Sequence, residues 1–313
     1  IMTGAPIPDG ADAIVMVELT EAATGDDTVL VKATVPPGNH VRAAGEDLSP
    51  GDEVVPAFTT LTPGHLGLLA TIGARRVPVF PRARVVVLST GDELVDGSAP
   101  LQPGQIRDAN RHALVAMVRE AGADPVDAGI VGDDVDAVRK AIAGALDEGD
   151  AVITSGGVSM GAYDPVKVVL RELAGSDTSM QVAIKPAKPL SFGVVDGKPV
   201  FGLPGNPASS MVSFELFARP ALRTMMGHAN ARRRELVAVA PEGFPRRPDG
   251  KTHLVRVALA QGEGDALVAT SAGGQGSNLL RSMAAADGLA LVEDGDGVAA
   301  GGRVRVLLLR DPL

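Results

Sequence analysis

Cysteine is absent from the 313-residue chain, and its absence excludes several kinds of chemistry at once. Without a thiol there is no cysteine nucleophile, no disulfide and no zinc site with cysteine ligands, which fits a reducing compartment. Uninterrupted hydrophobic runs of the roughly 20 residues needed to span a membrane are also lacking, and no signal-peptide pattern opens the chain. These absences predict a soluble, cytoplasmic protein that does not associate with membranes.

Positive charge is scarce, since 29 lysines and arginines face 38 aspartates and glutamates and leave a formal net charge of -9. A general nucleic-acid-binding protein normally has a basic face, so no nucleic-acid partner is expected, although a local site for a small anion remains compatible. The P-loop pattern GxxxxGK[ST] is also missing, because the nearest match, GVVDGKP, is one residue short and has Pro199 in place of the hydroxyl residue. HExxH is missing too, and the five scattered histidines do not predict a metal site.

The length and the 45% hydrophobic content predict a globular protein of more than one domain. Short β-type runs at 12–19 and 27–35 predict a β-rich domain over residues 1–46, and a small linking domain with a helix at 64–73 is expected over residues 47–82. The chain opens at Ile1 on the turn-rich run IMTGAPIPDG, which is typical of a domain interior. We therefore expect that the natural start of the protein is missing.

From residue 83 onward, strand-type and helix-type patterns alternate. The expected strands lie at residues 83–90, 125–131 and 150–156, and the expected helices at 108–122, 136–146, from Pro165 onward and from Pro207 to 227. Asp108 and Asn206 are predicted N-caps, and a kink or break is expected near Pro220. This alternation predicts an α/β central domain over 83–230, with a mixed, mostly parallel sheet covered on both faces. Short β-type runs then return and predict a β-barrel-like domain over 231–313.

Ligands of open parallel sheets bind beyond the carboxyl ends of the strands, where this chain has polar loops. The loop STGDEL contributes Ser89, Thr90, Gly91, Asp92 and Glu93. The loop TSGGVSMGAYD contributes Ser155, Gly156, Gly157, Ser159 and Asp164, and LPGNP contributes Pro204, Gly205, Asn206 and Pro207. Glycine-rich loops let backbone N–H groups approach an anion. Since Asp133 and Asp134 add further carboxylates, a bridging Mg²⁺ is expected, with Glu93 and Asp164 as candidate ligands.

Two lysines in VAIKPAKPLSFG, Lys185 and Lys188, each precede a proline. Proline biases the preceding residue toward extended backbone, so the pattern predicts two cations held for one oxyanion. Ala187 between them would be strained if the backbone there required a positive φ. A competing pattern, GVSMG, places Ser159 at the nucleophile position of a hydrolase elbow, but the two preceding glycines and the late helix start argue against a serine hydrolase.

Several segments together resemble the molybdopterin molybdenumtransferase family, known as MoeA in bacteria and as the gephyrin E domain in animals. They are IMTGAPIPDGADAIVMVE, STGDEL, SGGVSMGAYD and IKPAKPLSFG with VFGLPGNPAS, and VRAAGEDLSPGD and GGQGSNLLRSMAAADGL extend the resemblance to nearly the whole chain. The resemblance implies insertion of molybdenum from molybdate into adenylylated molybdopterin, with release of AMP and help from a divalent cation. It also implies a molybdopterin-binding fold in the centre and an elongated homodimer of four-domain subunits. Molybdopterin adenylyltransferase and cofactor-delivery proteins are candidate partners.

By matching motif, the resemblance also assigns roles to individual residues. It implies catalytic roles for Thr3, Asp47, Glu93, Asp133, Asp164, Lys185 and Lys188. It implies a pocket shaped by Pro204 and Pro207, and a molybdate site to which Arg256 and Ser277 contribute. Ala187 and Ala162 depart from the family pattern, in which glycine and an acid are usual, and the upstream segment with its DGYA-type motif is lacking. The alternatives are a molybdopterin adenylyltransferase and a scaffold or inactive paralogue, and the fragment as given is compatible with binding without activity.

Overall fold

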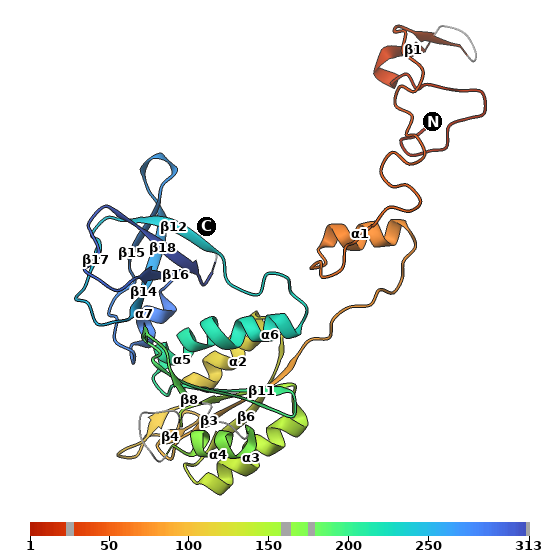
Figure 1. Ribbon diagram of the computed structural model, residues 1–313. Coiled ribbons are helices and arrows are strands. Elements are labelled where there is room, and N and C mark those ends of the chain that lie inside the picture. The colour runs from red at the N-terminus through yellow and green to blue at the C-terminus, as the bar shows by residue number, and fades with distance from the viewer. Residues whose placement is uncertain (23–27, 158–163, 175–178, 311–313) are drawn as a thin grey trace. The chain divides into compact units, whose positions relative to one another are not determined.

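The computed structural model describes residues 1–22, 28–157, 164–174 and 179–310 (Figure 1). The chain divides into two compact units, one made of Ile1–Ala57 and Leu61–Arg75 and the other of Phe58–Thr60 and Arg76–Leu313. No helix in the described part of the chain is long and apolar enough to cross a membrane. The domain boundaries expected at residues 46, 82 and 230 stay predictions.

The first unit contains short elements joined by turns. They are the 3₁₀ turn η1 (Val17–Leu19), strands β1 (Thr20–Ala22) and β2 (Val29–Val31), and helix α1 (Pro63–Thr71). The expected helix is confirmed, and it starts at a capping box between Thr62 and His65. The strand expected at 12–19 is wrong, because those residues form no strand and end in the turn η1, and β1 follows only at Thr20. The strand expected at 27–35 is confirmed only over β2, which pairs with β1 over three residues.

The second unit begins with a six-stranded sheet in the order β6-β3-β7-β11-β10-β8. Its strands are β3 (Arg84–Thr90), β6 (Asp124–Val131), β7 (Ala151–Ser155), β8 (Ser179–Gln181), β10 (Pro189–Val195) and β11 (Lys198–Leu203). β6, β3, β7 and β11 are parallel, whereas β10 is antiparallel to β11 and β8. The prediction of a mixed, mostly parallel sheet is therefore confirmed. Because Ser191 pairs with Gly202, β10 begins at the edge where β11 ends.

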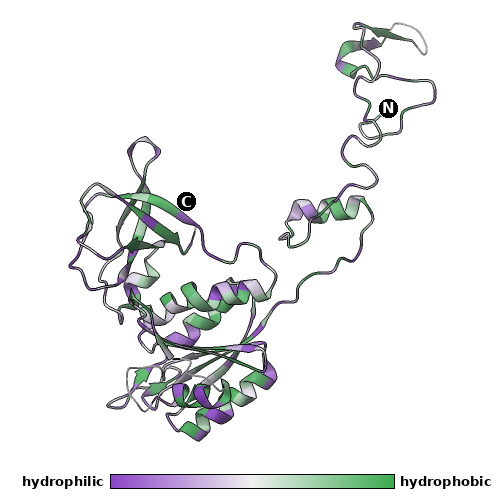
Figure 2. Ribbon diagram, in the orientation of Figure 1, coloured by the Kyte–Doolittle hydropathy of each residue, from purple (hydrophilic) through white to green (hydrophobic). Residues whose placement is uncertain are grey.

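Helices cover both faces of this sheet, as expected (Figure 1). They are α2 (Asn110–Glu120), α3 (Val135–Glu148), α4 (Pro165–Ala174), α5 (Pro207–Ser213) and α6 (Arg219–Met225). Alternation along β3 builds two cores, because Val85 and Val87 pack with α2, α5 and α6 while Val86 and Leu88 pack with α3 and α4. The helices accordingly carry hydrophobic and hydrophilic residues side by side (Figure 2).

Two helix details differ from the expectation. Helix α2 begins at Asn110 with Ala109 as N-cap, one residue later than expected. The buried Asp108 carboxylate still accepts the Arg111 backbone N–H at 3.1 Å, and it also contacts Arg111 Nε at 2.9 Å. The chain is not broken at Pro220. Instead, the π-helical turn η2 (Phe214–Ala218) joins α5 to α6, and this local change in hydrogen bonding accommodates a proline that has no backbone N–H to donate.

The C-terminal strands form a closed barrel, which confirms the barrel-like expectation. Its strands are β12 (Glu235–Ala240), β14 (Thr252–Gln261), β15 (Leu267–Ser271), β16 (Gly288–Val292) and β18 (Gly302–Leu308), with a short helix α7 (Leu280–Ala284). The order β15-β12-β18-β16-β14 closes through pairing of β14 with β15. A sixth strand, β9 (Ile184–Lys185), comes from the chain just before β10 and pairs in parallel with β14.

Candidate functional site

A cavity of about 640 Å³ lies at the carboxyl edge of the central sheet. Four parallel strands, β3, β6, β7 and β11, deliver their last residues or the residues that follow to it. From the predicted loops it is lined by Thr90, Gly91, Glu93, Asp133, Ser155, Gly156, Gly157, Asp164, Pro204, Gly205 and Asn206. Loops that are far apart in the sequence therefore meet at one site, as the strand-end rule predicts.

Asn110 connects two of these loops and was missed by the sequence analysis. Its amide donates to Ser155 Oγ at 2.8 Å and to the Gly205 carbonyl at 2.7 Å, so one side chain ties the end of β7 to the turn after β11. Asn110 is the first residue of α2 and also lines the cavity. No sequence pattern pointed to it, because an amide at the start of a helix has no distinguishing signature until both partners are placed.

Close approach of the loops requires glycine at position 156. Gly156 has φ +92°, and a Cβ there would lie 2.4 Å from the Thr90 carbonyl oxygen. Its backbone N–H donates to the Leu203 carbonyl at 3.1 Å, which joins a third loop to the arrangement. The buried Thr90 hydroxyl beside it has no hydrogen-bond partner within the described residues. A buried polar atom left open at the cavity is suited to a ligand.

The carboxylates at the cavity differ in what they contact. Asp92 and Asp133 link their loops, because Asp133 N–H donates to Asp92 Oδ1 at 3.1 Å and Asp92 N–H lies 3.4 Å from Asp133 Oδ2. Asp134 caps α3 through the Ala137 N–H at 2.8 Å. Asp164 is buried directly before the first turn of α4, where the helix dipole stabilises negative charge. Glu93 and Asp133 are exposed to solvent.

These carboxylates do not form a ready-made metal cage. No group of three or more histidine, aspartate or glutamate side chains placed to hold a metal occurs in the described ranges. Mg²⁺ is commonly held by one or two carboxylates together with substrate phosphates, and Glu93, Asp133 and Asp164 supply hard oxygen atoms of that kind. The donor set therefore fits a divalent cation that arrives with its substrate.

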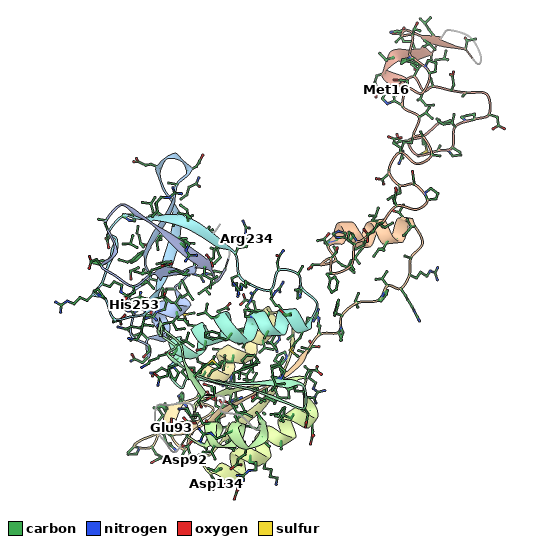
Figure 3. All side chains as sticks on the ribbon, in the orientation of Figure 1. Met16, Asp92, Glu93, Asp134, Arg234 and His253 are labelled. Atoms are coloured by element: carbon green, nitrogen blue, oxygen red, sulfur yellow. The ribbon has the colours of Figure 1, made fainter. Side chains whose placement is uncertain are left out.

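Other predicted residues lie elsewhere. Ser89 is fully buried and donates to Asp108 Oδ1 at 3.1 Å, and it is not a cavity-lining residue. Pro207 starts α5 beside the lining residue Asn206. Ser159 and Ala162 fall outside the described residues. Thr3 and Asp47 belong to the first unit, where both are exposed. Figure 3 shows the acidic loops through the labelled Asp92, Glu93 and Asp134.

The two lysines flank a strained residue. Ala187 has φ +80° and is 2% exposed, so the strain anticipated for a side chain at this position is confirmed. Lys188 is exposed and precedes Pro189, which lines the 640 Å³ cavity. Lys185 is also exposed, but it lines a different cavity of about 570 Å³ on the barrel. The structure does not bring the two lysines into one cavity lining, and their joint role stays a prediction.

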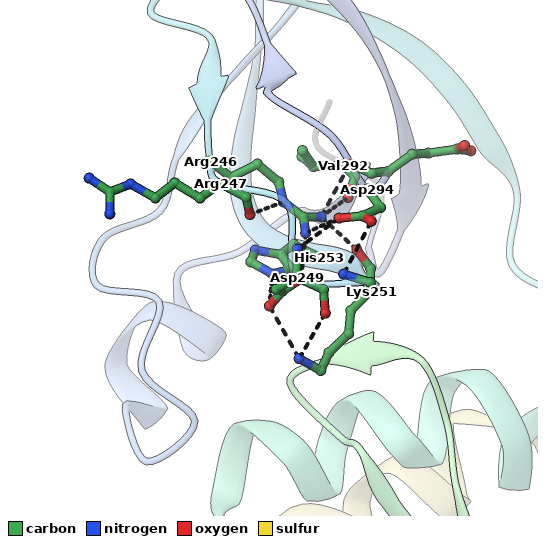
Figure 4. A network of polar contacts seen from close by, with 9 residues as sticks. Arg246, Arg247, Asp249, Lys251, His253, Val292 and Asp294 are labelled. Atoms are coloured by element: carbon green, nitrogen blue, oxygen red, sulfur yellow. Dashed lines mark hydrogen bonds and ion pairs between the residues drawn. The ribbon is translucent and has the colours of Figure 1, made fainter.

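A polar network borders the cavity that Lys185 lines (Figure 4). The buried Arg246 guanidinium contacts Asp249 and Asp294, and it donates to the carbonyl oxygens of Lys251 and Val292. His253 Nε2 lies 3.2 Å from Asp249 Oδ2. That hydrogen bond, with help from Lys251, lowers the pKa of Asp249 to about 2. The network fixes the loop between β13 (Phe244–Pro245) and β14.

Arg256 is fully buried on β14 and holds the loop that contains Ser277. Its Nη2 donates to the carbonyl oxygens of Gly274 and Gly276 at 2.9 and 3.0 Å, while Nε donates to Ser282 Oγ at 3.0 Å. Its Nη1 has no hydrogen-bond partner in the part of the chain that the structure describes. The Ser277 carbonyl accepts the backbone N–H of Ala208 at 3.0 Å, which seats this loop on the first turn of α5. Burial lowers the pKa of the Arg256 guanidinium.

Comparison with known proteins gives matches along nearly the whole chain. Family models described as "MoeA N-terminal region (domain I and II)", "Probable molybdopterin binding domain" and "MoeA C-terminal region (domain IV)" match residues 1–73, 86–224 and 238–309. Molybdopterin molybdenumtransferase 2 of Mycobacterium tuberculosis is 42% identical over 98% of this chain and 76% of its own length. Molybdopterin molybdenumtransferase of Bacillus subtilis is 36% identical over 99% and 73%. A crystal structure of a molybdopterin biosynthesis MoeA protein from Pyrococcus horikoshii has a TM-score of 0.76 at 31% identity, covering 97% of this chain and 74% of that one.

Proposed function

Because the chain belongs to the molybdopterin molybdenumtransferase family, we propose that it inserts molybdenum from molybdate into adenylylated molybdopterin, with release of AMP. The observation that supports this proposal is the 640 Å³ cavity, where glycine loops and carboxylates meet at the ends of four parallel strands. Backbone N–H groups of such loops suit phosphate oxygens. The carboxylates beside them suit a cation bound to the same phosphates.

The chain's own residues have separable tasks in this proposal. The loops at Gly91, Gly156 and Gly205 bind and orient the phosphoanhydride, and Asn110 keeps two of them in place. Mg²⁺, when bound, polarises phosphoryl oxygens and would be held by Glu93 and Asp164 together with substrate. Asp133, at the rim, completes the acidic side of the cavity.

Molybdate is a dianion, and the lysine stretch places an exposed cation, Lys188, directly before a lining residue of the cavity. Lys188 precedes a lining residue, while Lys185 and the Arg256 loop lie on the barrel side. At an effective dielectric constant near 20, a unit charge pair at about 4 Å contributes roughly 4 kcal/mol before desolvation. We propose that Lys188 receives the oxyanion and that Lys185, Arg256 and Ser277 complete its site.

The remaining assignments concern residues and partners beyond this cavity. By family resemblance, Thr3 and Asp47 are proposed to act at the active site of a homodimer, with Thr3 reaching it from another domain, that of the partner subunit. Molybdopterin adenylyltransferase is the proposed supplier of the adenylylated substrate, and a cofactor-delivery protein the proposed acceptor of the product. The cytoplasm, where these compounds would be exchanged, is the proposed compartment.

Release of AMP from adenylylated molybdopterin, measured with and without molybdate, tests the activity. We expect molybdate to accelerate release, and equal rates would overturn the proposed coupling. Asp133→Asn should lower the molybdate-dependent rate by about tenfold or more, since it removes a charge at the cavity. Asp134→Asn is the matched control, because asparagine also caps a helix and Asp134 is not a cavity-lining residue. Adenylylation of molybdopterin from ATP, without molybdenum insertion, would instead indicate an adenylyltransferase.

A further inference from the structure

A second, arginine-rich cavity lies where the helix α6 side of the central sheet meets the barrel. Its volume is about 1020 Å³, and its lining includes Arg219, Arg223, Arg232, Arg233, Arg234 and Arg310. The overall charge of the chain is -9, so this concentration of cations runs against the composition of the molecule. Figure 3 shows the labelled Arg234 well apart from Asp92 and Glu93 at the first cavity.

Carboxylates neutralise only some of these arginines. Arg233 is satisfied, since it contacts Glu215 at 2.9 Å and Glu120 at 2.7 Å, and Arg310 pairs with Asp287 at 2.7 Å. Arg219 reaches Glu215 only at 3.8 Å. The same carboxylate thus serves two guanidinium groups, and the closer one has the better geometry.

Arg219 and Arg223 keep buried donors open. The Arg219 side chain is 9% exposed, and the Nε atoms of both residues are buried without a hydrogen-bond partner among the described residues. Arg223 Nη2 faces His228 Nδ1 at 3.2 Å, which must be an unprotonated acceptor there. Burial and, after it, the positive charge of Arg233 lower the pKa of Arg219, although Glu215 acts in the opposite direction.

Arg232 and Arg234 are exposed at the cavity, and no ion pair joins either to a carboxylate in the described part of the chain. The lining also contains four leucines, Leu236, Leu267, Leu308 and Leu309. Guanidinium groups present paired donors that match phosphate oxygens. The leucines offer a surface to a planar or apolar group attached to those phosphates.

We propose that this arginine cavity binds a small organic diphosphate or triphosphate, with the phosphates on the unpaired arginines and the organic group against the leucines. The site is separate from the cavity of the proposed reaction, because no residue lines both. It therefore adds a ligand to the protein and does not depend on the molybdenum chemistry.

Isothermal titration of the full chain with ADP, pyrophosphate and adenosine tests the proposal. ADP should bind more tightly than pyrophosphate because it also contacts the leucines, and adenosine without phosphate should not bind at this site. Arg232→Glu/Arg234→Glu should weaken ADP binding at this site by about tenfold or more. Higher ionic strength should also weaken ADP binding to the wild-type protein.

Arg247→Glu/Arg303→Glu is the matched control, since both arginines are exposed on the barrel and neither lines the cavity. It makes the same change in net charge and should leave ADP binding unchanged. Asp133→Asn, at the other cavity, should also leave this binding intact, which separates the two sites. The same ADP affinity and stoichiometry in Arg232→Glu/Arg234→Glu as in wild type would overturn the proposal, as would equal losses in the control.

Discussion

Removing the Asn110 amide should loosen the candidate site in a measurable way. The side chain makes two hydrogen bonds, at 2.8 Å to Ser155 Oγ and at 2.7 Å to the Gly205 carbonyl. Each such bond contributes about 1 kcal/mol net. Because Asn110 is half-buried, water replaces part of the loss, and Asn110→Ala should lower the free energy of unfolding by about 1 to 2 kcal/mol. Urea unfolding, followed by circular dichroism, measures the change.

Asn110→Asp is the sharper variant because it keeps the size of the side chain. Asp at the start of α2 would gain about 0.5 kcal/mol from the helix dipole. A carboxylate cannot donate to the Gly205 carbonyl, however, and the two oxygen atoms would repel each other. The loss should therefore still exceed the gain. Arg119→Ala, an exposed change on the same helix, should alter stability by less than about 0.5 kcal/mol. Unchanged unfolding midpoints in both Asn110 variants would refute the reasoning.

Three further results are expected. Ala187→Gly should change the free energy of unfolding by less than about 1 kcal/mol, because relief of backbone strain at φ +80° offsets the greater freedom of the unfolded chain. Ala187→Val should lower it by about 2 kcal/mol or more. Equal urea midpoints for the two variants would contradict this. Arg111→Ala should lower the free energy of unfolding by about 3 kcal/mol, because it leaves the buried Asp108 carboxylate without its partner. Arg139→Ala removes only an exposed ion pair and should lower it by less than about 1 kcal/mol. Thermal unfolding that ranks the two variants in the opposite order would count against this reasoning. Burial and nearby arginines lower the pKa of His228 below 6.5, so below this pH the unfolded chain takes up a proton that the folded protein does not. Wild type should therefore lose stability relative to His228→Gln as pH falls below 6.5. An NMR titration midpoint of His228 at or above 6.5 would contradict this.

Much of the central domain follows from local patterns. The continuous apolar run at 85–88 on β3 predicts a strand buried on both faces, and prolines at positions 165 and 207 mark the first residues of two helices. Once the strands are parallel, the loops after β3, β7 and β11 must share an edge, which is why most of the glycines and carboxylates predicted for the site line one cavity. Local periodicity sufficed because these features depend on neighbours in sequence.

Features that depend on distant partners were not accessible in the same way. Asn110 has meaning only through Ser155 and Gly205, and pairing of β9 with β14 joins segments about 70 residues apart. The long strands expected in the first unit failed for a related reason, since β propensity forms a strand only over the residues that find a partner. The Asp108 carboxylate also looked like a simple cap until its burial against Arg111 was known.

The short strand β9 makes the lysine stretch a connection between the barrel and the central sheet. Ile184 and Lys185 are fixed in register to the barrel through Thr252 and His253, whereas the chain from Pro189 is fixed in the central sheet. Any rotation of the barrel against that sheet would act on the short segments that flank β9, which are residues 182–183 after β8 and residues 186–188 before β10, the second of which contains Ala187. The distance between the two lysine positions would then change with the orientation of the barrel. It can be measured as a distance between spin labels placed at residues 185 and 188.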